Sequence, residues 1–184
     1  MQSIKDIIIA QKFGILCGSL FISLLFSCKN SSNYEFPSFE ISTSGCYKTC
    51  PILDVKLYDN VVYYDFIKFN KSKGTYQYKL TIDDIDKLNY LIKSLALDSL
   101  KEEYASHTPD VQVYNTKFTY RGEEKNVYFF ENEAPKNYQD LINYIISFKE
   151  NKIVKMDTIL NITTRERVPF EEMQIPPMPK DSIN

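Results

Sequence analysis

The hydrophobic pattern of this chain changes period twice, and this change limits the folds open to it. Between residues 39 and 80, apolar and polar side chains alternate in short runs, which is typical of strands with one buried face. From Ile82 to about Leu97, apolar residues recur at helical spacing, and strand and helix patterns then follow again before residue 149. The order predicts an α+β fold, an antiparallel sheet of about five to seven strands with two amphipathic helices packed on one face.

Local signals predict where some of these elements turn or begin. Asp59 and Asn60 separate two β-rich runs, and both residue types tolerate the positive φ of a type I′ turn, so we expect a hairpin there. Thr81 followed by Asp84 has the form of a capping box and predicts the start of the first helix. Pro135 is expected at the first position of the second helix, because that position needs no backbone N–H donor.

The N-terminal region has the layout of a secretory signal. Lys5 and Lys12 precede an apolar run of 14 residues, 13–26, and the small residue Ser27 follows it. The run is well short of the ~20 residues that a membrane-spanning helix needs. Because Cys28 follows Ser27 directly, the stretch resembles a bacterial lipoprotein signal, in which the cysteine is acylated and becomes the first mature residue. Cleavage by an ordinary signal peptidase, which would release a soluble secreted protein, is the alternative.

These patterns suggest four segments. We expect a lipoprotein signal peptide at 1–27, a flexible polar tether at 28–38, one α+β domain at 39–151 and a C-terminal extension at 152–184. The extension contains an alternating stretch at 153–162 that can add an edge strand. Its proline-rich end is expected to be poorly ordered, as chain termini often are.

The charge balance argues against nucleic acid as a partner. The chain has 22 Lys and Arg against 24 Asp and Glu, and removal of the signal would leave 20 against 23. Such a chain has no basic excess to neutralise phosphates. The expected partners are therefore the membrane, through the lipid anchor, and a protein or carbohydrate that binds an outward-facing group of the tyrosines on the strands. The anchor predicts a bacterial cell-envelope location on the outer membrane, and leaves open whether the domain faces the periplasm or the outside.

Cys46 and Cys50 are an even pair that remains after Cys17 leaves with the signal and Cys28 is acylated. In an oxidising compartment a disulfide between them is the first expectation. A redox dithiol is a second interpretation, although such pairs usually have two intervening residues rather than three. The third is a metal site that adds His107 and Asp110 as ligands.

Catalytic signals are weak in this sequence. His107 is the one histidine, and no nucleophile turn or glycine-rich phosphate loop accompanies it in a chain of five glycines. We therefore expect no catalytic residue and no cofactor, and interpret the protein as a non-catalytic binding or structural module. An inhibitor or partner-binding domain and an enzyme that uses His107 with Asp110 or the cysteines are the alternatives.

One stretch of the mature chain is specific enough to suggest a family. Gly45-Cys46 followed by Cys50-Pro51, the hairpin with Asp59 in its turn, Gly74 before a strand and Asp110 before another resemble bacterial envelope lipoproteins with domain of unknown function 6438. The resemblance covers Phe39 to about Phe148. It implies a lipoprotein with a compact α+β domain, and it implies no activity.

Overall fold

The computed structural model describes residues 38–46, 49–105, 110–120 and 123–168. The elements in these ranges are β1 (Ser38–Thr43), β2 (Ile52–Tyr58), β3 (Val61–Lys68), β4 (Gly74–Lys79), α2 (Ile82–Lys93), η1 (Leu97–Ser99), β5 (Glu103–Tyr104), β6 (Val113–Tyr120), β7 (Glu123–Phe130), α3 (Lys136–Ser147), η2 (Phe148–Glu150), β8 (Val154–Lys155) and η3 (Thr164–Arg167), where η marks a 3₁₀ helix. The expected signal, Cys28 and the proline-rich end lie outside the described residues. None of the helices in the described ranges has the length and apolar character needed to span a membrane.

The strands form one sheet in the order β5–β7–β6–β1–β2–β3–β4–β8. β1 lies in the middle and pairs antiparallel with both β2 and β6. Only the β5–β7 pair among the described strands is parallel. The α+β prediction is confirmed. The sheet has eight strands rather than five to seven because two strands of 2 residues each, β5 and β8, lie at its edges. β8 lies within the stretch 153–162, whose alternation predicts an added edge strand.

The turn and cap signals are confirmed with one small shift. Asp59 and Asn60 have φ angles of 47° and 62°, as a type I′ turn requires. Thr81 is the N-cap of α2, and its side chain accepts a hydrogen bond from the backbone N–H of Asp84 while the Asp84 carboxylate accepts one from the backbone of Thr81. Pro135 is the N-cap residue of α3 rather than its first helical residue.

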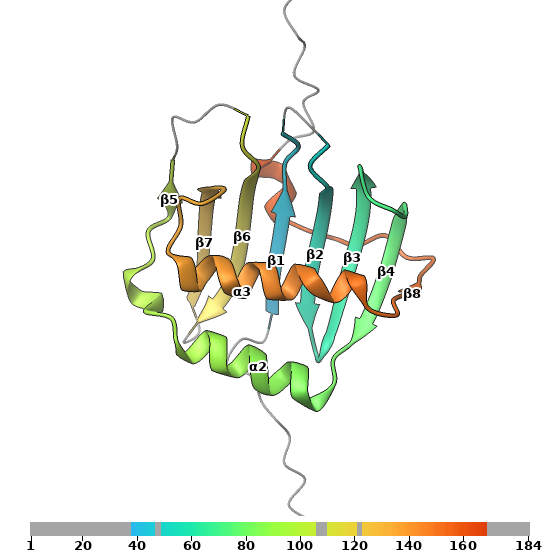
Figure 1. Ribbon diagram of the computed structural model, residues 1–184, viewed down its shortest axis with the longest axis horizontal. Coiled ribbons are helices and arrows are strands. Elements are labelled where there is room, and N and C mark those ends of the chain that lie inside the picture. The colour runs from blue at the N-terminus through green and yellow to red at the C-terminus, as the bar shows by residue number, and fades with distance from the viewer. Residues whose placement is uncertain (1–37, 47–48, 106–109, 121–122, 169–184) are drawn as a thin grey trace, which may run out of the picture. The chain divides into compact units, whose positions relative to one another are not determined.

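Both α-helices lie on one face of the sheet, where they bury the hydrophobic core (Figure 1). α3 crosses the strands and buries a stripe along one of its sides, and α2 adds a second stripe next to it. Two fully buried tyrosines place their hydroxyls in this core: the Tyr64 hydroxyl donates to the Ile145 carbonyl at 2.7 Å, and the Tyr138 hydroxyl lies 2.5 Å from the Thr116 hydroxyl. The buried helical side chains are Ile85, Leu88, Ile92, Tyr138, Leu141, Ile142 and Ile145.

Residues 152–168, here called the C-terminal strap, pack against the other face of the sheet. The strap begins at the sheet edge, where β8 pairs with β4 and the backbone N–H of Met156 donates to the Thr75 carbonyl at 2.9 Å. It ends behind β1 and β6, where η3 lies (Figure 1). Thr164 and Val168 are buried there. The packed fold therefore continues to Val168, past the boundary that the sequence suggested at Asn151.

Candidate functional site

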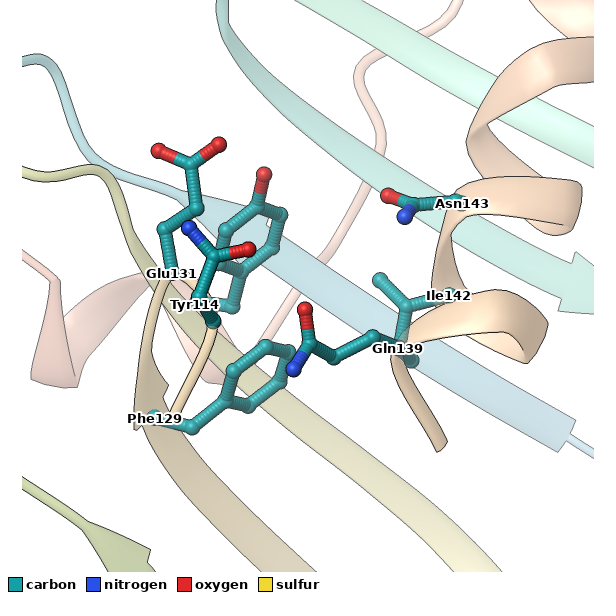
Figure 2. A pocket seen from close by; sticks show the side chains of 7 residues that line it. Tyr114, Phe129, Glu131, Gln139, Ile142 and Asn143 are labelled. Carbon is teal, nitrogen blue, oxygen red and sulfur yellow. The ribbon is translucent and has the colours of Figure 1, made fainter. Parts of the chain in front are cut away.

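A hollow lies between the end of α3 nearest β7 and the ends of β6 and β7 (Figure 2). Its floor includes the stacked rings of Tyr114 and Phe129, whose centroids are 4.9 Å apart, and Gln139 and Ile142 of α3 line it from the opposite side. Its volume of about 50 Å³ is far below the ~300–1,000 Å³ of typical small-molecule sites. The hollow therefore has room for ordered water but not for a substrate of ordinary size.

Tyr114 also belongs to a hydrogen-bond network that fixes the loop of the two cysteines. Its hydroxyl donates to Gln112 Oε1 at 3.0 Å, and Gln112 Nε2 donates to the carbonyls of Ser44 and Pro51 at 2.9 and 2.8 Å. These two carbonyls belong to opposite ends of the loop, so one buried amide holds both. Burial and the negative charge of Glu131 raise the pKa of Tyr114 to about 12, so its hydroxyl stays a donor well into the alkaline range.

Cys46 and Cys50 are joined in the structure, with their Cα atoms 5.5 Å apart, a separation common for disulfides. The geometry is thus compatible with the disulfide expected from the sequence, and the oxidation state of the native protein stays a prediction. His107 lies outside the described residues, so the set of Cys46, Cys50, His107 and Asp110 stays untested as a whole. No group of three or more His, Cys, Asp or Glu side chains in the described ranges could hold a metal ion.

A cluster of buried polar side chains lies on the strap side of the sheet. The Ser42 hydroxyl donates to Asp54 Oδ1 at 2.6 Å across the β1–β2 pair, and lies 2.7 Å from the hydroxyl of Thr164 in the strap. Asn115 of β6 donates from Nδ2 to the Thr164 carbonyl at 2.8 Å. Each of these four side chains is buried, so the cluster joins three strands of the sheet to the strap.

Arg165 completes this cluster. Its guanidinium donates to Asp54 Oδ1 from Nη2 at 2.5 Å and from Nε at 3.0 Å. It also donates to the carbonyls of Thr43, Leu53 and Val168, at 2.8, 3.0 and 3.0 Å. The side chains of Arg165 and Asp54 are 15% and 9% exposed, so this is a largely desolvated ion pair. Its many protein contacts indicate that it holds the strap and leaves little of Asp54 for a ligand.

Two carboxylates next to this pair show how the strap changes the electrostatics of the face. Burial and the nearby negative charge of Asp54 raise the pKa of Asp65, against the opposing charge of Arg165. Burial alone would also raise the pKa of Glu40, but hydrogen bonds from Lys56 and from Thr163 of the strap outweigh burial and hold that pKa below its usual range. Glu40 is therefore a charged anchor for the strap.

Asp84, the acid of the capping box, has a structural role beyond the cap. Asp84 Oδ2 accepts from the hydroxyls of Thr81 and Tyr78 at 2.7 and 2.9 Å in addition to the cap contact. These hydrogen bonds outweigh burial and lower the pKa of Asp84. Burial and the charge of Asp84 raise the pKa of Tyr144 on α3 to about 12. The group joins β4, α2 and α3.

The match of this chain to a known family covers most of the fold described above. The model of the family described as Domain of unknown function (DUF6438) matches residues 37–149, a span that includes the sheet from β1 to β7 and both α-helices. The strap, with Thr164 and Arg165, lies after the matched residues. A search of curated proteins finds no match. Because the family model covers more than half of the chain, the protein belongs to the DUF6438 family.

Proposed function

We propose that this protein is a lipid-anchored component of the bacterial cell envelope, whose folded domain is a non-catalytic binding or structural module. The observation that carries the proposal is Cys28, directly after the apolar run and the small residue Ser27. Acylation at this cysteine would attach the domain to a membrane, and the outer membrane is the location we favour.

The start of the folded domain fits this arrangement. β1 begins at Ser38, ten positions after Cys28, and an extended chain spans at most ~3.6 Å per residue. The anchor and the first strand would thus be separated by at most about 36 Å. This is enough for the domain to stand clear of the headgroups or to turn and touch them.

The non-catalytic part of the proposal is supported by how the polar side chains are used. Asp54 is held by Arg165 and Ser42, and Asp84 serves as the capping residue of α2. The hollow beside Tyr114 is too small for an ordinary substrate. These groups stabilise the fold, which favours a domain that acts through its surface.

Metabolic labelling with a clickable palmitate analogue tests the anchor. Full-length protein and Cys17→Ser should incorporate the label, whereas Cys28→Ser should not. Cys17→Ser is the matched control, because Cys17 lies inside the same N-terminal region but ahead of the expected cleavage site. Mass spectrometry of the mature protein should find an acylated N-terminal Cys28, and an unacylated N-terminus would refute the anchor. Protease treatment of intact cells would then show which side of the membrane the domain faces.

A further inference from the structure

The turn between β3 and β4 displays an aromatic ring beside lysines. Phe69 is 46% exposed there, and Lys68 Nζ lies 5.0 Å from the centroid of its ring. Lys71 and Lys73 are exposed on the same turn. An exposed phenylalanine among exposed cations is unlike the buried aromatic pairs of the sheet. We call residues 68–73 the β3–β4 tip.

The tip holds Phe69 outward in a fixed and unfavourable backbone conformation. Phe69 has a φ of 57°, in the left-handed region that bulky side chains rarely occupy. The next residue, Asn70, donates from Nδ2 to the carbonyls of Ile52 and Lys68, both at 2.8 Å, and so ties the tip to the start of β2. Gly or Asn would take this conformation more easily. The chain thus tolerates strain at the position where the ring is displayed.

Charges on neighbouring elements leave the tip cationic. Glu150 of η2 pairs with Lys71 of the tip at 3.1 Å, and both side chains are largely exposed. Lys149 of η2 lies close to the tip. Burial lowers its pKa, the negative charge of Glu150 opposes this effect, and the positive charge of Lys71 adds to it. Exposed pairs of this kind are weak, so Glu150 does not cancel the field of the lysines.

The narrow shape of the tip favours an anionic lipid bilayer over an anionic protein as its partner. A stable protein interface uses about 20–30 residues on each side, whereas the tip is a narrow turn of six residues from 68 to 73. The phosphates of lipid headgroups attract lysines near the surface, and segments that bind a bilayer surface bury Phe, Trp and Leu at the boundary between headgroups and acyl chains. The tip therefore fits a bilayer surface better than the flat face of a protein.

We propose that the β3–β4 tip binds the surface of an anionic lipid bilayer, with Phe69 inserted among the headgroups and Lys71 and Lys73 against their phosphates. The contact is made by the folded domain, so the proposal does not rest on acylation of Cys28. With the anchor in place, the contact would hold the domain in one orientation on the membrane.

The chain has no tryptophan, so Phe69→Trp introduces a single fluorescent reporter at the tip. Tyr90→Trp is the matched control, because Tyr90 is 68% exposed on α2 and also has a lysine, Lys87, with Nζ 5.9 Å from its ring centroid. The tip precedes β4 and α2 follows it, so the tip and the helix that carries Tyr90 adjoin opposite ends of this strand. The two variants thus compare similar surroundings at different places on the fold.

The Cys28→Ser protein should be mixed with vesicles of phosphatidylcholine and phosphatidylglycerol. Emission of Phe69→Trp should shift to the blue and be quenched by brominated acyl chains, while Tyr90→Trp should be unchanged. Vesicles of phosphatidylcholine alone and inorganic phosphate should give no shift. Lys73→Gln in the Phe69→Trp background should weaken partitioning about five-fold, the effect of one lysine near an anionic surface. No shift at the tip, an equal shift at Tyr90, or a partition constant unaffected by Lys73→Gln would overturn the proposal.

Discussion

Replacing Arg165 by alanine should destabilise the domain more than any exposed arginine would. The change leaves Asp54 charged beneath the strap, where the Ser42 hydroxyl still donates to its carboxylate, and it removes the donor to the Leu53 carbonyl. Breaking a desolvated ion pair by removing one partner typically costs 3–5 kcal/mol, so we expect a loss of about 4 kcal/mol. For a domain of this size that corresponds to a decrease in Tm of roughly 10–20 °C.

Arg167→Ala is the matched control for this prediction. Arg167 lies in the same η3 turn, but its side chain is 49% exposed, its ion pair with Glu103 is 3.6 Å long, and its remaining contact is a ring contact with Tyr128 at 4.9 Å. Exposed pairs and ring contacts of this kind contribute about 1 kcal/mol or less. Chemical denaturation of the two variants should therefore separate them by about 3 kcal/mol.

A double variant without either charge tests the physical reason. Asp54→Leu combined with Arg165→Met replaces both charges by apolar groups, and such replacements are often close to neutral because no charge remains buried alone. The double variant should be more stable than Arg165→Ala. Equal unfolding free energies for Arg165→Ala and Arg167→Ala would refute the assignment of Arg165 as the residue that holds the strap.

Three further predictions follow from single contacts. Reduction, or replacement of Cys46 and Cys50 by serine, should cost about 2 kcal/mol by loop-closure entropy, and thiol titration of the folded native protein should find neither thiol free. Thr81→Ala should lower the free energy of unfolding by about 1 kcal/mol in denaturant titration, because the backbone N–H of Asp84 then loses the side-chain acceptor that caps α2. The pKa of Tyr144 is about 12 in the fold and near 10 in the unfolded chain, so its stabilising effect is complete below pH ~10 and is lost as pH rises through the folded value. Ultraviolet absorption should show a late-ionising group of phenolates, and Tyr144→Phe should lower the amplitude of that group by one phenolate while Tyr114 still ionises late.

The elements that the sequence predicted are those that repeat a pattern over many residues. β2, β3 and α2 each alternate or recur over seven or more positions, and Thr81 places the helix start with a local contact. β8 lies within the alternating stretch 153–162, where the sequence predicts an edge strand, although the strand itself has two residues. Its pairing with β4 depends on where the strap runs, and such a long-range cause cannot be inferred from the residues of β8.

The strap was missed for a different reason. Ser42 and Asp54 alternate with apolar residues on their strands, and this is the pattern of a face exposed to water. The structure shows that their partners, Thr164 and Arg165, come more than a hundred positions later in the chain. A polar residue in a strand looks the same in sequence whether it meets water or a buried partner, so the pattern alone could not distinguish them.

Because the strap covers the sheet face opposite the helices, a binding function should be sought elsewhere on the domain. An open, tyrosine-rich sheet face would have been a natural binding surface. In the structure, however, the core-facing Tyr64 is buried, and Tyr128 on the strap side lies under the guanidinium of Arg167. Helices cover one face and the strap crosses the other. The exposed aromatic side chains in the described ranges therefore lie elsewhere: Tyr58 at the end of β2, Phe69 in the β3–β4 tip and Tyr90 on α2. Among these three, Phe69 is the one that a strained, hydrogen-bonded turn holds outward among lysines.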